Sequence, residues 1–167
     1  MFCFFDRYFS ENGCNFRATD DAGATAFLVS CFEAKLPVVE LFLEACCGRG
    51  RLASNATVAD CANFQMSDGY SGLHAAVEDE QLGLLRLLCN YSFSSLKAKN
   101  APTRKGHSRL RWCLNINPTL STTGETPLHF AAQKNAPKLV ATLLQAGALP
   151  NLLSTRKLSP LHMVGHF

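Results

Sequence analysis

A short helical segment recurs along this chain, and its recurrence constrains the fold more than any other feature. The best copy runs from Thr126 to Ala132 and reads TPLHFAA, and related segments begin at Thr25, Ser71 and Ser159. Threonine and serine are favoured N-cap residues, and proline is tolerated at the first helical position because it has no N–H to leave unpaired. Each copy therefore predicts the start of a short helix.

A second apolar pattern follows each complete copy. Behind the best copy, Leu139-Val140 and Leu143-Leu144 lie four residues apart, which predicts an amphipathic helix, and Gly147 can adopt the left-handed conformation that ends it. The unit is thus a helical hairpin, and one hairpin buries too little apolar surface to fold alone, so the copies should stack. Equivalent apolar pairs follow the segments at Thr25 and Ser71: Val38-Val39, Phe42-Leu43, Leu84-Leu85 and Leu87-Leu88.

The interval from Thr126 to Ser159 is 33 residues. This period and its Thr-Pro-Leu-His segment resemble the ankyrin repeat family, whose unit is about 33 residues long. The resemblance implies an all-α, ankyrin-type solenoid of helical hairpins, with about three repeats, a partial fourth and two long inserts between repeats. The chain would be a single domain, 1–167, with repeats at about 16–47, 62–93 and 117–149 and a partial repeat at 150–167.

The first repeat departs from the signature of the family. Ala26 and Leu28 stand where the family has proline and histidine. The hydrogen bonds that this histidine normally makes to the turn are therefore expected to be missing in the first repeat. Its inner helix is expected at about 26–34 and its outer helix at about 38–45.

Two intervals between the copies exceed the period: 46 residues from Thr25 to Ser71, and 55 residues from Ser71 to Thr126. The excess predicts inserts at about 46–65 and 94–118. The second insert, the basic insert, indicates a contact with nucleic acid, acidic phosphates or an acidic protein, or a nuclear import signal; a tolerated surface loop is the alternative. Its basic residues and the tryptophan that follows them are Lys97, Lys99, Arg104, Lys105, Arg109, Arg111 and Trp112.

Charge is divided unevenly along the chain. Residues 1–80 hold 5 basic and 12 acidic side chains, a balance of −7, whereas residues 81–167 hold 11 and 1, a balance of +10; together they give the net +3. Position in the sequence of a solenoid corresponds to position along its axis. We therefore expect an acidic end and a basic end, which would steer a charged partner.

Composition and patterning argue against a membrane protein and against a secreted one. No apolar run approaches the ~18 residues that a membrane-spanning helix needs, so we expect no membrane insertion. The apolar start of the chain is interrupted by Asp6 and Arg7, which argues against a signal peptide and for a cytoplasmic, possibly nuclear, location. The chain has 8 cysteines, and those in or beside predicted helices should be reduced structural thiols: Cys31, Cys46, Cys47 and Cys89.

No catalytic, cofactor or metal site is expected. The chain lacks a phosphate-binding glycine loop, a His-Glu-x-x-His pair and a Cys-x-x-Cys pair. His74, His129 and His162 occupy one equivalent position of successive repeats, where the resemblance implies a hydrogen bond that stabilises the turn. A catalytic residue has no reason to recur with the period of the fold, so we expect a protein that is not an enzyme.

The resemblance places binding on the tips of the fingers, which are the hairpin turns between repeats, and on the exposed positions of the inner helices. We locate these positions in each repeat by counting from its N-cap residue, which gives one set of expected binding residues per repeat. The expected partner-binding residues are Asp20, Asp21, Val29, Phe32 and Glu33 in the first repeat, Asp68, Tyr70, Ala75, Glu78 and Asp79 in the second, and Thr122, Thr123, Phe130, Gln133 and Lys134 in the third.

Two functional hypotheses follow. The first is a non-enzymatic module that binds another protein, as an adaptor or an inhibitor. Its repeat number and irregular inserts resemble IκB-type inhibitors of Rel transcription factors, which would imply a basic peptide as partner of the acidic half. The alternative is binding of nucleic acid or an acidic phosphate through residues 97–111, with an affinity that falls steeply with salt.

Overall fold

The computed structural model describes residues 17–46, 62–91 and 114–164 of the 167. Residues 97–112 of the basic insert, which hold its basic side chains and Trp112, lie outside the described residues, as does most of the first insert. Within the described ranges the chain forms seven helices and no strand. The all-α class expected from the sequence is confirmed.

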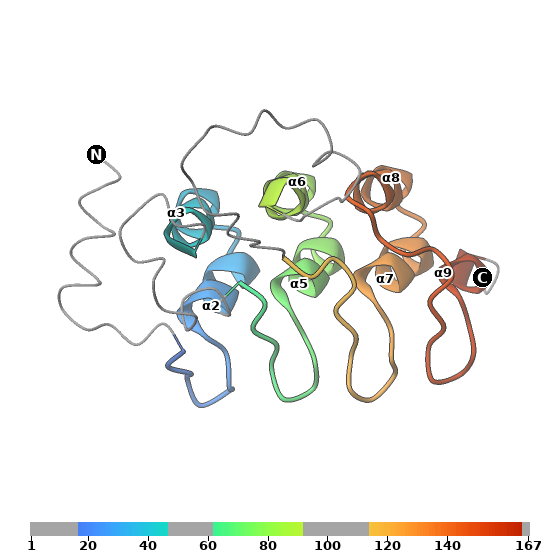
Figure 1. Ribbon diagram of the computed structural model, residues 1–167, viewed down its shortest axis with the longest axis horizontal. Helices are drawn as coiled ribbons and strands as arrows, with labels where there is room; N and C mark the ends of the chain where they lie inside the picture. The colour runs from blue at the N-terminus through green and yellow to red at the C-terminus, as the bar shows by residue number, and fades with distance from the viewer. Residues whose placement is uncertain (1–16, 47–61, 92–113, 165–167) are drawn as a thin grey trace, which may run out of the picture.

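The helices form two parallel rows (Figure 1). The inner row holds α2, α5, α7 and α9, the outer row holds α3, α6 and α8, and the fingers project away from the outer row. The expected solenoid of helical hairpins is therefore present, with a short inner helix as the described part of the fourth repeat. The bounds are α2 Ala26–Phe32, α3 Leu36–Cys46, α5 Gly72–Glu78, α6 Leu82–Tyr91, α7 Pro127–Gln133, α8 Pro137–Gln145 and α9 Pro160–Val164.

The ends of α7 show why these residues form a short helix. Thr126 is its N-cap residue, with an extended backbone at φ −100° and ψ 166°, and Pro127 is its first residue. After the C-cap residue Lys134, Asn135 has a φ of 51°. This left-handed residue turns the chain toward Pro137, the first residue of α8.

The same turn shortens the first inner helix relative to its expected range of 26–34. Ala34 has a φ of 50°, at the position equivalent to Asn135, and a left-handed residue cannot continue a right-handed helix. The helix α2 therefore ends at Phe32. The outer helix begins earlier than expected, at Leu36 rather than near Val38.

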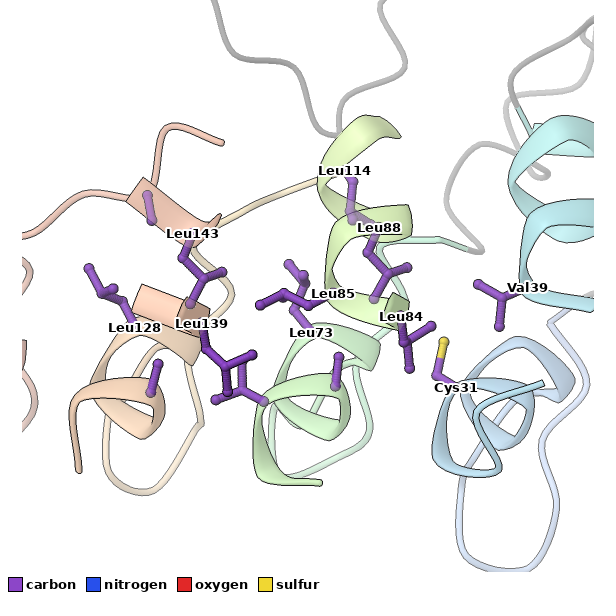
Figure 2. Close-up of a cluster of buried hydrophobic side chains, with 14 of the residues drawn as sticks. Cys31, Val39, Leu73, Leu84, Leu85, Leu88, Leu114, Leu128, Leu139 and Leu143 are labelled. Carbon is purple, nitrogen blue, oxygen red and sulfur yellow. The ribbon is translucent and has the colours of Figure 1, made fainter. Parts of the chain in front are cut away.

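A continuous apolar core runs between the two rows of helices (Figure 2). Small side chains at Ala131 and Ala132 are buried, which lets α7 pack closely against its neighbours. Leu114 also belongs to this core, with 9% of its surface exposed, although the sequence placed it inside the basic insert. The end of that insert, which the structure describes from Leu114 onward, thus packs on the repeats.

Each finger is closed by backbone hydrogen bonds and ends at the N-cap residue of the next inner helix. The fingers comprise residues 20–25, 66–71, 120–126 and 154–159. In the first finger the N–H of Asp20 donates to the carbonyl of Ala24 (3.0 Å). The third finger is one residue longer, because the equivalent bond joins Leu120 to Glu125 (3.0 Å).

Candidate partner-binding surface

The histidines of the repeat signature hold the inner helices at their N-termini. Nδ1 of His74 accepts a hydrogen bond from the N–H of its own N-cap residue, Ser71 (3.3 Å). Nδ1 of His129 accepts in the same way from Thr126 (3.1 Å), and that of His162 from Ser159 (3.2 Å). The turn-stabilising role expected for these histidines is what the structure shows.

Two of these histidines also join their repeat to the next one. Because Nδ1 accepts, Nε2 carries the hydrogen and donates. Nε2 of His74 lies 3.4 Å from the carbonyl oxygen of Glu125, and Nε2 of His129 lies 3.1 Å from that of Leu158. Burial lowers the pKa of His74 to about 4, so its ring is neutral near pH 7 and is used as a structural donor and acceptor.

The first repeat lacks this arrangement, as expected. Leu28 occupies the histidine position and is fully buried. The cap of α2 is made by Thr25 alone, whose hydroxyl oxygen accepts from the N–H of Leu28 at 3.4 Å. The inner helices after the first are thus held more firmly at their N-termini than α2 is.

Most of the expected partner-binding residues lie on the surface formed by the fingers and the inner helices. Ten of the expected residues have a charged, threonine or amide side chain; that of Thr123 is half-buried and the other nine are exposed. The apolar members are less exposed: Val29 has 38% of its surface exposed, and Phe32, Tyr70 and Phe130 are half-buried. The exposed polar set is Asp20, Asp21, Glu33, Asp68, Glu78, Asp79, Thr122, Gln133 and Lys134.

Ala75 does not belong to this surface, and the expectation that it is exposed is wrong. Only 1% of its surface is exposed. Its methyl group does not reach beyond α5, which is packed between α2 and α7. The equivalent positions carry the larger side chains of Val29 and Phe130, which extend further outward.

Two expected residues of the first repeat share a hollow. The hollow has a volume of about 520 Å³ and is lined mainly by small side chains together with Asp20, Val29 and Lys35. It lies beside the first finger and α2. The structure therefore places Asp20 and Val29, two of the expected residues of the first repeat, on one hollow.

A row of aromatic rings crosses the inner helices. The ring centroids of Phe32 and Tyr70 are 5.8 Å apart, those of Tyr70 and His74 are 5.4 Å apart, and those of His74 and Phe130 are 5.4 Å apart. The sequence singled out these residues one repeat at a time and did not predict the row. The sequence places the fourth finger at residues 151–157, but Arg156 at its exposed tip was not singled out as a binding residue.

Burial determines the reactivity of the thiols of Cys31 and Cys89. Burial raises the pKa of the Cys31 and Cys89 thiols to about 12, which makes both poor nucleophiles and poor metal ligands. In the part of the chain that the structure describes, no group of three or more His, Cys, Asp or Glu side chains is placed to hold a metal ion. None of the described helices is both long and apolar enough to span a bilayer.

A comparison with protein families agrees with this geometry. A family model described as ankyrin repeats, in three copies, matches residues 52–154, which is more than half of the chain. The match begins after α2 and α3, which form the hairpin that diverges most from the signature. Ankyrin repeats act in general as non-enzymatic modules for binding other proteins. By its helical hairpins, its capping histidines and this match, the chain belongs to the ankyrin repeat family.

Proposed function

We propose that this chain is an adaptor or an inhibitor that binds a partner protein along its fingers and the exposed ends of its inner helices. One observation supports this: the exposed charge of the fingers changes sign along the solenoid. The first finger exposes Asp20 and Asp21, the second exposes Asp68, and the fourth exposes Arg156 and Lys157. The third finger exposes no charged side chain.

The C-terminal ends of the inner helices follow the same order. Glu33 is the C-cap residue of the first, although it pairs with Lys35 at 2.9 Å, and Glu78 and Asp79 are the last residue and the C-cap residue of the second. Lys134 ends the third. A partner should therefore present basic groups to the first two repeats and acidic groups to the last two.

The size of this surface sets the length of the segment that it can bind. Packed helices lie ~8–10 Å apart, so the inner helices from α2 to α9 span roughly 30 Å. An extended chain advances ~3.3 Å per residue. A segment of about nine residues, basic at one end and acidic at the other, would cover the whole row.

Inhibition of a Rel transcription factor, as by IκB-type proteins, is one specific form of this proposal. The acidic fingers of the first two repeats suit the basic peptide that such a partner would present. In that form the protein acts in the cytoplasm or the nucleus. Identification of the captured partner decides between this form and a general adaptor role.

The test is capture of proteins from combined cytosolic and nuclear extracts. The intact chain is compared with a front variant, D20N/D21N/E78Q/D79N, and with a back variant, E40Q/K138Q, which removes one exposed acidic and one exposed basic side chain from the outer helices and leaves the net charge unchanged. A third variant neutralises the six basic residues between 97 and 111. We expect the intact chain, the back variant and the 97–111 variant to retain the same protein, and the front variant to lose it.

Two results would contradict the proposal. Equal capture by the front variant and the intact chain would place binding elsewhere. Loss of the captured material with the 97–111 variant, together with its release by nuclease, would favour the alternative of nucleic-acid binding through the basic insert.

A further inference from the structure

The row of aromatic rings meets the acidic end of the surface at Tyr70. Tyr70 lies in the second finger, in ring contact with Phe32 from α2, and both side chains are half-buried. Part of each ring therefore remains open to solvent. This ring pair bridges the first and second repeats, at a place where a side chain of a bound peptide could lie flat against it.

Three carboxylates act on Tyr70: those of Glu78, Asp79 and Asp68. The hydroxyl of Tyr70 donates a hydrogen bond to the carboxylate of Glu78. The pKa of Tyr70 is raised far above its usual value, first by burial and then by Glu78, with smaller contributions from Asp79 and Asp68. The phenol therefore stays protonated near pH 7.

These carboxylates have spare hydrogen-bonding capacity. Asp68 uses one oxygen to accept from the N–H of Tyr70 at 2.9 Å, and Glu78 uses one oxygen for the hydroxyl of Tyr70. Both side chains and that of Asp79 are exposed. Among residues 17–46, 62–91 and 114–164, no lysine or arginine forms an ion pair with any of the three.

The position of the acids is unfavourable for the isolated helix. Glu78 is the last residue of α5, Asp79 is its C-cap residue, and Glu80 follows with a φ of 53°. Acidic side chains at a helix C-terminus oppose the helix dipole, typically by ~0.3–1 kcal/mol each, and repel one another. The same turn after α7 carries Lys134, which suits the dipole. A bound cation would relieve this repulsion.

From this arrangement we infer that Phe32, Tyr70, Glu78 and Asp79 form a subsite for one arginine side chain of the partner segment. A guanidinium group is planar and can stack on an aromatic ring while its N–H groups donate to carboxylates. An ammonium group would satisfy the carboxylates without stacking in the same way. The inference rests on the proposed function, because it specifies what the acidic end of that same surface binds.

The test uses a small probe that needs no partner protein. Blocked arginine, N-acetyl-arginine amide, is titrated into the full chain at low ionic strength, and the backbone amide shifts of residues 32–33, 70 and 78–80 are followed by NMR. N-acetyl-lysine amide is the matched probe. We expect saturable shifts confined to these residues, with binding of arginine at least about threefold tighter than that of lysine.

Variants separate the subsite from general attraction to an acidic surface. E78Q/D79N changes exposed side chains that the core does not need, and it should weaken binding of the arginine probe at least about fivefold. Tyr70→Phe keeps the ring and should retain most of the binding, whereas Tyr70→Leu should remove the preference for arginine over lysine. Glu40→Gln, on the outer helix α3, should change nothing.

Equal binding of the two probes, or shifts that survive E78Q/D79N, would overturn the subsite. That result would leave the proposed function intact, because capture of a partner by the intact chain and its loss in the front variant do not depend on an arginine preference. The converse result, an arginine preference without any captured partner, would support the subsite and count against the proposed function.

Discussion

The junction between the first and second repeats is built differently from the two junctions that follow it. The first junction packs α2 against α5 through apolar atoms: a Cβ on Gly72 would lie 2.9 Å from Sγ of Cys31 and 3.6 Å from the ring of Phe27. Among the described residues of the first two fingers and of α2 and α5, no hydrogen bond crosses this junction.

The second and third junctions are joined by hydrogen bonds as well. At the second, the N–H of Ser121 donates to the carbonyl of Asp68 at 2.7 Å. At the third, the N–H of Thr155 donates to the carbonyl of Thr123 at 2.9 Å. Hydrogen bonds fix the register of neighbouring fingers, whereas apolar contacts are non-directional. The first junction, where Phe32 meets Tyr70, is therefore the one best able to adjust to a bound segment.

The largest expected effect is that of Gly69→Ala at the second junction. Gly69 has a φ of 86°, and an added Cβ would lie 2.5 Å from the carbonyl oxygen of Thr119 and 2.7 Å from the nitrogen of Ser121. Left-handed strain and overpacking against backbone atoms together should cost about 2–5 kcal/mol of the free energy of unfolding. Urea denaturation followed by circular dichroism measures this loss.

Gly23→Ala is the matched control at the first junction. Gly23 has a φ of 79°, but no atom lies within 4 Å of an added Cβ. Only the left-handed strain remains, so the expected cost is about 1–2 kcal/mol. Equal costs at Gly23 and Gly69 would show that the fingers of the second junction are not packed as closely as described.

The next effect is a dependence of stability on pH that belongs to the second junction. Burial lowers the pKa of His74 from 6.5 to about 4. Between these values the unfolded chain binds more protons than the folded chain, so stability should rise as the pH is raised from 4 to 6.5 and fall as it is lowered. The full contribution is about 3 kcal/mol.

The measurement is the free energy of unfolding at several pH values in this window, for the wild-type chain and for His74→Gln. Glutamine does not titrate, so the variant should show a smaller rise between pH 4 and 6.5, after the shared titration of the carboxylates. Parallel profiles for the two proteins would mean that His74 is not buried in its neutral form.

A smaller effect is expected when the third junction is made to resemble the first. His129→Leu copies the residue found at Leu28 and removes the acceptor of the Thr126 N–H and the donor to the carbonyl of Leu158. The carbonyl keeps its bond from the N–H of Ser154, but the buried N–H of Thr126 loses its partner. The cost should be about 1–3 kcal/mol.

Hydrogen exchange shows where that loss falls. Exchange of the amides in α7 and α9 should become faster, while the amides of α2 should be unaffected, because repeats contact only their neighbours. Faster exchange across the whole solenoid would contradict the local role given to His129.

The repeat architecture could be predicted because its signals are local. A hydroxyl N-cap, a proline, a histidine and a glycine at set positions each act on residues within a few places of themselves. Thr126 and Ser159 therefore located α7 and α9 without knowledge of their neighbours. The same local logic placed a left-handed glycine, Gly147, after the end of α8, where its φ is 96°.

Features that depend on contacts between distant segments could not be predicted in this way. Ala75 is buried because its short side chain lies on α5 between α2 and α7, and the sequence of α5 alone does not show how closely these two helices pack against it. The ring contact of Phe32 with Tyr70 joins residues 38 positions apart, and Leu114 enters the core from the end of an insert. Local patterns carry no information about such distances.

The smallest effect is expected at the fourth finger, where Lys157 takes the place of the glycine found in the other fingers. Lys157 has a φ of 63°, in the region that Gly23, Gly69 and Gly124 occupy in the other fingers. Lys157→Gly removes the left-handed strain of a side chain, at the cost of more freedom in the unfolded state, and should raise the free energy of unfolding by about 0.5–1 kcal/mol. Lys157→Ala, which removes the charge but keeps the Cβ, should leave stability nearly unchanged, because the strain remains. If Lys157→Ala raised the free energy of unfolding as much as Lys157→Gly, the gain would come from the lost charge and not from the backbone. The left-handed strain at residue 157 would then not weaken the third junction.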